Sequence, residues 1–189
     1  MRIVGGKNKG TQIFAPDNRA TRPTSDRVRE AVFNILAHGI DGFSLEGARV
    51  LDLFAGTGAL GLEALSRGAR YVHFVDDSTE ARGVIRRNAD ALGEIGRCKI
   101  WRRDVVRLGS CAPLPRFDLV FIDPPYGKGM GERALGVILD GGWLNGEAVV
   151  VLEESAREEI EVPAGFETVS VRTYGDTQLI ILKAGQACP

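Results

Sequence analysis

The feature that most constrains the fold of this 189-residue chain is an apolar segment that runs directly into a glycine turn. Arg49–Phe54 has the composition of a buried strand, and Gly56, Gly58 and Gly61 follow at the spacing of a dinucleotide-binding fingerprint. Ala59–Ser66 then reads as a helix. A strand, a tight turn and a helix in this order present backbone N–H groups to a ligand at the start of the helix. The segment therefore predicts an α/β domain that binds a nucleotide-like ligand.

The same alternation of strand and helix continues along the chain, which favours a parallel sheet with right-handed crossovers. The last two strands are separated by only four residues, and so short a connection requires an antiparallel hairpin. A seven-stranded, mostly parallel, Rossmann-like sheet with an antiparallel C-terminal hairpin is therefore expected. Its strands are predicted at Arg49–Phe54, Tyr71–Val75, Cys98–Arg102, Asp118–Ile122, Ala148–Leu152, Thr168–Thr173 and Gln178–Lys183, and its helices at Ala59–Ser66, Glu80–Leu92 and Glu132–Leu139.

The first 40 residues have a different pattern. Arg2–Gly5 and Thr11–Phe14 are short apolar segments around a basic, glycine-containing tip, which predicts a small β-hairpin. Thr24 or Ser25 can cap the helix that follows. Its apolar stripe comprises Val28, Ala31, Val32, Ile35 and Leu36. We expect residues 1–40 to form a hairpin-and-helix extension and residues 41–189 the main domain, with no second core.

Composition limits the protein class. A chain of this length suits one α/β domain, and 44% hydrophobic with 26% charged residues is ordinary for a globular protein. No apolar run reaches membrane-spanning length, and Cys98, Cys111 and Cys188 are too scattered for a zinc site or a disulfide framework. His38 and His73 have no ligand partner at metal spacing. We therefore expect a cytoplasmic monomer that uses neither a membrane nor a metal.

The net charge is only −1, but the charge is unevenly distributed. Residues 1–33 hold seven bases and three acids, residues 82–103 hold seven bases and two acids, and residues 147–167 hold seven glutamates and one arginine. A polarised protein of this kind can present one face to a polyanion while staying near neutral overall. For the 82–103 block, a solvated helix face is an equal alternative.

Two features argue against a dinucleotide as the ligand. Asp52 ends the first strand where a pyrophosphate would approach, and its carboxylate repels phosphates but attracts an ammonium or a sulfonium group. Asp123-Pro124-Pro125-Tyr126 follows another apolar strand, and hydride transfer has no use for such a segment. Together they indicate S-adenosylmethionine as cofactor and an exocyclic amine as methyl acceptor.

Four aspartates, Asp52, Asp76, Asp104 and Asp123, fall at or near the ends of predicted strands, so they should converge on one rim of the sheet. Asp52 suits the amino group of the methionine moiety, Asp76 the two ribose hydroxyls, and Asp104 the adenine amino group. Capping a helix or holding a turn is the alternative role for such aspartates. The expected cofactor-binding set is Asp52, Phe54, Ala55, Gly56, Gly58, Asp76, Asp77, Asp104 and Val105.

Asp123, Pro124, Pro125 and Tyr126 are the predicted catalytic residues. The lone pair of an aromatic amine is delocalised into its ring, so the amine is a poor nucleophile. The Asp123 carboxylate and the Pro124 carbonyl can accept both amine hydrogens and localise that lone pair, because consecutive prolines hold the turn rigidly. Tyr126 can stack on the base and fix its plane.

Several segments, taken with these motifs, resemble the RsmD family of bacterial methyltransferases, which act on guanine N2 in small-subunit ribosomal RNA. They are Arg2-Ile3-Val4-Gly5-Gly6 and Arg22-Pro23-Thr24-Ser25-Asp26-Arg27-Val28-Arg29-Glu30-Ala31-Val32-Phe33-Asn34. The similarity covers nearly the whole chain and implies a class I S-adenosylmethionine-dependent methyltransferase fold. It also implies 16S rRNA, within the small subunit or a late assembly intermediate, as the partner.

By position, candidate phosphate contacts are Lys7, Lys9, Arg19, Arg22, Arg27 and Arg29. Arg22 or Arg27 could instead hold the N-terminal helix on the main domain. Three other functions stay open on sequence grounds. They are a DNA adenine-N6 or cytosine-N4 methyltransferase, an NAD-dependent oxidoreductase that uses the glycine fingerprint, and a non-enzymatic RNA-binding assembly factor.

Overall fold

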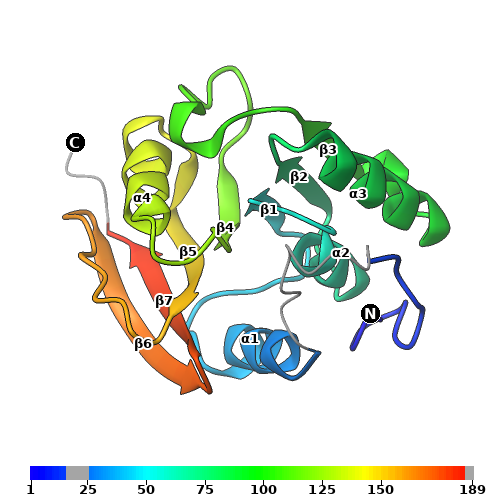
Figure 1. The fold of residues 1–189 in the computed structure, drawn as a ribbon, viewed down its shortest axis with the longest axis horizontal. Helices are drawn as coiled ribbons and strands as arrows, with labels where there is room; N and C mark the ends of the chain where they lie inside the picture. The colour runs from blue at the N-terminus through cyan, green and yellow to red at the C-terminus, as the bar shows by residue number, and fades with distance from the viewer. Residues whose placement is uncertain (16–25, 186–189) are drawn as a thin grey trace.

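The computed structural model describes residues 1–15 and 26–185. Its centre is a seven-stranded sheet in the order β3-β2-β1-β4-β5-β7-β6 (Figure 1). The first five of these strands are parallel, and β7 runs antiparallel between β5 and β6. The expected parallel sheet with an antiparallel C-terminal hairpin is therefore confirmed.

The predicted elements are confirmed to within a few residues. The strands are β1 (Arg49–Leu53), β2 (Tyr71–Val75), β3 (Cys98–Trp101), β4 (Phe117–Ile122), β5 (Leu144–Ser155), β6 (Phe166–Tyr174) and β7 (Thr177–Ala184), and the helices are α1 (Asp26–His38), α2 (Ala59–Ser66), α3 (Thr79–Ala91) and α4 (Met130–Asp140). Two single 3₁₀ turns, η1 (Ile95–Arg97) and η2 (Val105–Arg107), were not predicted. Within the described residues, no helix is long and apolar enough to span a membrane.

The sheet has a hydrophobic core on each face. Side chains of α1, α2 and α3 cover one face, and side chains of α4 and the η2 turn cover the other. Strand β1 contributes to both, since Val50 lies in the first cluster while Leu51 and Leu53 lie in the second. A strand buried on both faces needs an almost continuous apolar run, which is what made β1 recognisable in the sequence.

The N-terminal segment packs onto this core. A single antiparallel bridge joins Arg2 to Gln12, so the predicted hairpin forms with minimal strand pairing. Ile3 and Ile13 are buried in the cluster that also holds residues of α1 and α2. Residues 1–15 and α1 therefore extend the core of the main domain. The predicted caps Thr24 and Ser25 lie outside the described residues.

Arg29 corrects one sequence-based expectation. This candidate phosphate contact is fully buried on α1, and its guanidinium donates to the Arg2 carbonyl at 2.5 Å and to the Asp26 carboxylate at 2.8 Å. Arg29 thus joins the N-terminal segment to α1 and is not presented to RNA. The alternative considered for Arg22 or Arg27, holding the helix on the main domain, stays a prediction.

Candidate active site

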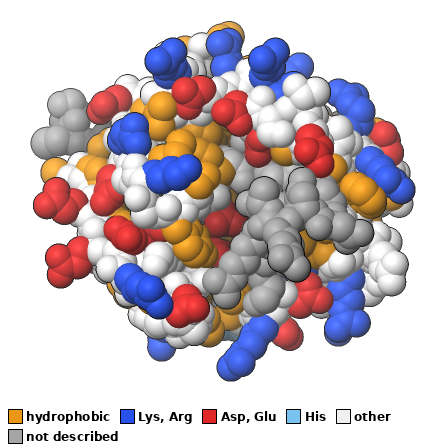
Figure 2. Space-filling view, viewed as in Figure 1, with side chains coloured by type: hydrophobic (Ala, Val, Ile, Leu, Met, Phe, Trp, Pro, Cys, Tyr) orange, Lys and Arg blue, Asp and Glu red, His pale blue; other side chains and the backbone are white. Residues whose placement is uncertain are grey.

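A cavity lies where the order of strands along the sheet reverses. Strands β2 and β3 lie on one side of β1, while β5 lies beyond β4 on the other side. Ligands of open α/β sheets bind beyond the carboxyl ends of the strands at such a point. The cavity there has a volume of about 580 Å³ and is lined by residues that follow β1, β2, β3 and β4. In the face shown in Figure 2, lysine and arginine side chains lie mostly near the margin.

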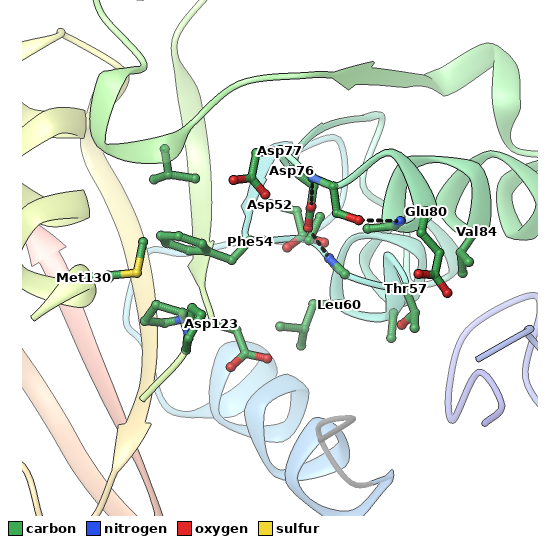
Figure 3. A pocket seen from close by; sticks show the side chains of 18 of the residues that line it. Asp52, Phe54, Thr57, Leu60, Asp76, Asp77, Glu80, Val84, Asp123 and Met130 are labelled. Atoms are coloured by element: carbon green, nitrogen blue, oxygen red, sulfur yellow. Dashed lines mark hydrogen bonds between the residues drawn. The ribbon is translucent and has the colours of Figure 1, made fainter. Parts of the chain in front are cut away.

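The four aspartates predicted to meet at one rim, Asp52, Asp76, Asp104 and Asp123, all line this cavity. The other expected cofactor residues Phe54, Ala55, Gly56, Asp77 and Val105 line it too, as do Pro124, Pro125 and Tyr126. The convergence predicted from strand ends is therefore confirmed. In the view of Figure 3, Asp123, Phe54 and Met130 lie toward one end, and Glu80, Thr57 and Val84 toward the other.

The glycine turn follows β1 in a conformation that only a few residues tolerate. Phe54 has a φ of 57° and is the sole described non-glycine residue with positive φ, a conformation that costs of order 1–3 kcal/mol. Gly56 follows with a φ of 54°, and a Cβ atom on it would meet only the Phe54 carbonyl oxygen, at 3.9 Å. Strain of this kind persists only where the surrounding structure enforces it. The strained turn lines the cavity through Phe54, Ala55 and Gly56.

Gly58 has a packing role. It does not line the cavity, and a Cβ atom on it would lie 3.2 Å from the Ile85 side chain and 3.3 Å from the Phe74 ring. With a φ of 77°, Gly58 is the N-terminal cap residue of α2. The residue therefore allows α2 to pack closely on α3 and β2. Its expected contact with the cofactor stays a prediction.

Asp52 is buried near the end of β1, with only 2% of its surface exposed. Its Oδ2 accepts a hydrogen bond of 2.9 Å from the backbone N–H of Gly61 in α2. Burial raises the pKa of Asp52 to about 8, and the nearby charge of Asp76 acts in the same direction. The carboxyl group therefore joins α2 to β1 through this hydrogen bond. A cationic ligand group placed beside Asp52 would favour the ionised form of its carboxyl group.

Asp76 closes the glycine turn. One carboxylate oxygen accepts from the N–H of Gly56 and the other from the N–H of Ser78, each at 2.9 Å (Figure 3). Burial raises the pKa of Asp76, and these two hydrogen bonds oppose that shift. The turn-holding alternative thus applies to Asp76, but each oxygen keeps a further lone pair for a ligand hydroxyl.

At the end of β3, Asp104 caps the η2 turn through a 3.1 Å bond from the Val106 N–H to its Oδ1. Val105 is buried beside it and Arg103 also lines the cavity. The capping alternative therefore holds for Asp104 as well. Its binding to adenine stays a prediction.

The Asp123–Tyr126 segment is anchored from the neighbouring strands. The Tyr126 hydroxyl donates to Glu153 Oε1 on β5 at 2.6 Å and lies 3.2 Å from Thr177 Oγ1 on β7. Burial and the bond to Glu153 both raise the pKa of Tyr126, so the hydroxyl stays protonated and can donate. The next residue, Gly127, donates its N–H to Glu154 Oε1 at 3.2 Å. Two adjacent glutamates thus fix the end of the predicted catalytic segment.

Sequence reasoning missed these two glutamates and much of the cavity wall. The additional lining residues come from the first residues of the chain, from helices and the turns before them, and from the segment after β3: Met1, Ala15, Thr57, Ala59, Leu60, Ser78, Glu80, Ala81, Val84, Arg103 and Met130. A helical location was predicted only for Ala59, Leu60, Glu80, Ala81 and Val84. Which of their side chains face the cavity depends on how each helix is rotated, and a single strand–turn–helix motif does not specify that rotation.

The candidate RNA contacts divide into three groups. Lys9 and Arg27 are exposed, and Lys7 is exposed but forms a 2.7 Å ion pair with the buried Glu94. Arg29 is buried, as described above. Arg19 and Arg22 lie outside the described residues. RNA binding by the exposed members stays a prediction.

Comparison with known proteins identifies the family. A family model described as conserved hypothetical protein 95 matches residues 1–183. The chain is also 36% identical over 167 residues to ribosomal RNA small subunit methyltransferase D of Escherichia coli strain K12, an alignment that covers 88% of this chain and 81% of that protein. The chain belongs to the RsmD family. This RsmD-family chain is likewise 30% identical to the Haemophilus influenzae methyltransferase D, over 93% of its own length and 89% of the relative.

Solved structures show the same fold. The Escherichia coli protein yhhF, described as a candidate methyltransferase, superposes with a TM-score of 0.83, at 29% identity and 98% coverage of both chains. An RNA methyltransferase from Salinibacter ruber in complex with S-adenosyl-L-homocysteine superposes with a TM-score of 0.66, at 12% identity, over 88% of this chain and 96% of that one. The fold of the RsmD-family chain is therefore that of class I S-adenosylmethionine-dependent methyltransferases.

Proposed function

We propose that this protein transfers a methyl group from S-adenosyl-L-methionine to the exocyclic N2 of a guanine in small-subunit ribosomal RNA. One observation carries the proposal. The Asp123–Tyr126 segment and the Asp52 and Asp76 carboxylates line one cavity from opposite sides of the β1–β4 strand reversal. An amine-binding group and a cofactor-binding set are thereby brought within reach of each other.

The residues of the cavity fit the cofactor. A volume of about 580 Å³ is in the usual range for small-molecule sites. Gly56 leaves backbone accessible, Asp76 retains acceptor capacity for ribose hydroxyls, and Asp104 with Val105 would hold the adenine. S-adenosylmethionine, when bound, supplies an electrophilic methyl group.

The chain's own part is to activate and orient the acceptor. Asp123 and the Pro124 carbonyl accept the amine hydrogens, which localises the nitrogen lone pair toward the methyl group. Asp123 need not be a strong base, because the amine becomes acidic only as the methyl group is transferred. Tyr126 provides a stacking surface whose position is set by Glu153 and Thr177. Alignment of the nitrogen and the methyl carbon then accounts for the remaining acceleration.

Ribosomal RNA is the proposed substrate because the relatives from Escherichia coli and Haemophilus influenzae are named as ribosomal RNA small subunit methyltransferases. A base in a structured loop must be splayed out to enter the cavity, at a cost of a few kcal/mol. Exposed basic residues of the N-terminal segment and of α1, including Lys9 and Arg27, would bind the surrounding phosphates. We further propose that the protein acts as a cytoplasmic monomer on the small subunit or a late assembly intermediate.

Methyl-labelled S-adenosylmethionine incubated with small subunits from cells lacking this enzyme tests the proposal. After digestion to nucleosides, the label should appear in N2-methylguanosine. Asp123→Ala should abolish this transfer, while calorimetry should show cofactor binding largely unchanged. Full activity in Asp123→Ala would refute the mechanism. Label only in duplex DNA assayed in parallel would indicate a DNA amine methyltransferase, and RNA binding without any label would indicate an assembly factor.

A further inference from the structure

Phe14 is an aromatic side chain that the fold leaves in solvent. It is 42% exposed, and the other exposed large hydrophobic residues in the described part of the chain, Ile95, Val169 and Val171, are aliphatic. Neither core cluster includes Phe14, although its neighbour Ile13 is buried. The ring therefore contributes little to core packing, and part of its surface is open to a ligand.

The exposed ring is paired with a cation. The guanidinium carbon of Arg87, on the exposed side of α3, lies 4.2 Å from the centroid of the Phe14 ring. Among the described residues, no carboxylate lies within ion-pair distance of Arg87. The pair thus combines a planar apolar face with a planar guanidinium whose charge has no carboxylate at ion-pair distance in residues 1–15 and 26–185.

The backbone of Phe14 is held rigidly. Asn88, which is buried, accepts from the Phe14 N–H at 2.7 Å and donates to the Phe14 carbonyl at 3.0 Å. The same Asn88 amide donates to the Thr57 carbonyl at 3.0 Å. Because Asn88 and Arg87 are adjacent on α3, one short segment fixes the Phe14 backbone and also places a guanidinium on its ring. A preorganised surface loses little entropy on binding.

This pair lies beside the candidate active site. Thr57, which shares Asn88 with Phe14, lines the cavity, and so does Ala15, the residue directly after Phe14. Met1, whose carbonyl accepts from the Ile13 N–H at 3.0 Å, lines it as well. Phe14 is therefore next in the chain to a residue of the cavity wall, and its backbone is bound to the same Asn88 as the cavity-lining Thr57.

We propose that Phe14 and Arg87 form a stacking platform for an unpaired RNA base that neighbours the methylated nucleotide. The inference rests on the proposed function, because it needs a nucleic acid whose target base occupies the cavity. Single-stranded RNA is the ligand that fits, since unstacked bases bind on aromatic rings and guanidinium planes while the positive charge attracts the backbone. A paired base would present only its edge, so the platform selects a splayed loop.

A short single-stranded RNA that contains 2-aminopurine is the probe, because stacking on an aromatic ring quenches its fluorescence. Wild-type protein should quench it, and Phe14→Leu, which keeps the apolar volume without the π face, should lose the quenching. Affinity for the RNA should fall about 5- to 50-fold, as expected for one base–aromatic stack. Phe14→Trp should restore both properties, and Arg87→Lys should weaken binding less than Phe14→Leu. Val171→Ala, on the far β6 strand, is the matched control for an exposed hydrophobic residue.

Methyl transfer to small subunits separates this inference from the proposed function. Phe14→Leu should raise the KM for the subunit by the same factor, with kcat and cofactor affinity unchanged. If the wild type transfers methyl groups, and Phe14→Leu has the same KM and the same quenching as the wild type, the platform is refuted and the proposed function stands. Phe14-dependent quenching without any transfer by the wild type would support the platform and refute the methyltransferase proposal. Absence of both quenching and transfer in the wild type would refute both.

Discussion

At the scale of single residues, Tyr126 depends on partners that are distant in the chain. Its hydroxyl is bound by Glu153 and lies next to Thr177, and both partners come from strands that pair with each other. Only 7% of Glu153 is exposed, so its carboxylate is held in place rather than free to move in solvent. We therefore assign Glu153 a positioning role: it sets the plane of the Tyr126 ring without touching the substrate.

Glu153→Ala should lower kcat about 10- to 100-fold, because a displaced ring no longer aligns the acceptor nitrogen, and small misplacements cost rates of this size. The KM for S-adenosylmethionine should be unchanged. Glu153→Gln retains an acceptor for the hydroxyl and should recover most of the activity. Initial rates at saturating cofactor and varied RNA measure both variants. If Glu153→Ala had the kcat of the wild type, Glu153 would have no positioning role in the reaction.

Residue identity and spacing sufficed to predict which aspartates meet, because the ends of parallel strands share one edge of the sheet. They did not indicate burial. Arg29 resembles Arg27 in sequence, yet one is fully buried and the other exposed, since they lie on opposite sides of α1. Gly58 likewise looked equivalent to Gly56, but neighbouring side chains surround only Gly58. These distinctions arise from packing between elements, which a local motif does not encode.

At the scale of elements, two glycines inside helices differ in what surrounds them. A Cβ on Gly61 of α2 would lie 2.4 Å from the Phe74 ring and 2.7 Å from Val72. A Cβ on Gly136 of α4 would have no atom within 4 Å among its surroundings. The sequence predicts both glycines inside helices. The packing of α2 on β2 is what makes the surroundings of Gly61 crowded and those of Gly136 open.

Gly61→Ala should therefore destabilise the protein by about 1–3 kcal/mol, the usual cost of overpacking. It should also disturb the bond from the Gly61 N–H to Asp52. Gly136→Ala should stabilise by about 0.5–1 kcal/mol, because alanine lowers the conformational entropy of the unfolded chain and relieves the helix of a glycine. Urea unfolding of the two variants and the wild type gives both values. Equal stability of the two variants would contradict the packing argument.

The start of β5 shows why one element boundary was misplaced. The strand was predicted from Ala148, where the apolar run begins, but it starts at Leu144. After Leu144 the strand continues with Asn145, Gly146 and Glu147, two polar residues and a glycine that are typical of a loop. A register shift between Phe117 and Leu119 on β4 lets Leu144 pair there, and Asn145 binds Asp118 through its side chain. Tertiary pairing extends the strand beyond its local pattern.

At the scale of the whole molecule, two buried ionisable groups give the free energy of unfolding an opposite dependence on pH. His73 on β2 is fully buried against Trp101, with 4.2 Å between ring centroids, and within the described part of the chain neither ring nitrogen has a hydrogen-bond partner. Burial, with the charges of Lys99 and Arg49, lowers the pKa of His73 to about 4. Asp52 has the opposite shift, to about 8.

The unfolded chain protonates His73 near its ordinary pKa of about 6.5, whereas the folded protein does so only near 4. Stability should therefore fall as the pH drops from about 6.5 to about 4, by up to about 3 kcal/mol. The folded protein keeps Asp52 protonated up to about pH 8, and the unfolded chain loses that proton near 4. Asp52 consequently makes stability fall as the pH rises toward 8.

The two effects oppose each other between about pH 4 and pH 6.5, and above pH 6.5 only that of Asp52 remains. Urea unfolding from pH 4 to pH 9 should therefore show little change in stability up to about pH 6.5, followed by an alkaline limb that falls toward about pH 8. His73→Phe should remove the contribution that opposes Asp52, so the stability of this variant should fall from about pH 4 onward. The slope is the relevant quantity, because a larger ring in a packed cluster also costs stability at every pH. Asp52→Asn should flatten the alkaline limb, since the amide oxygen still accepts from Gly61 without ionising. His38→Gln is the matched control, because His38 is exposed and is the other of the two histidines in the chain. If His38→Gln changed the slope of stability between pH 4 and pH 6.5 and His73→Phe did not, the buried imidazole would not be the group that opposes Asp52 in this range.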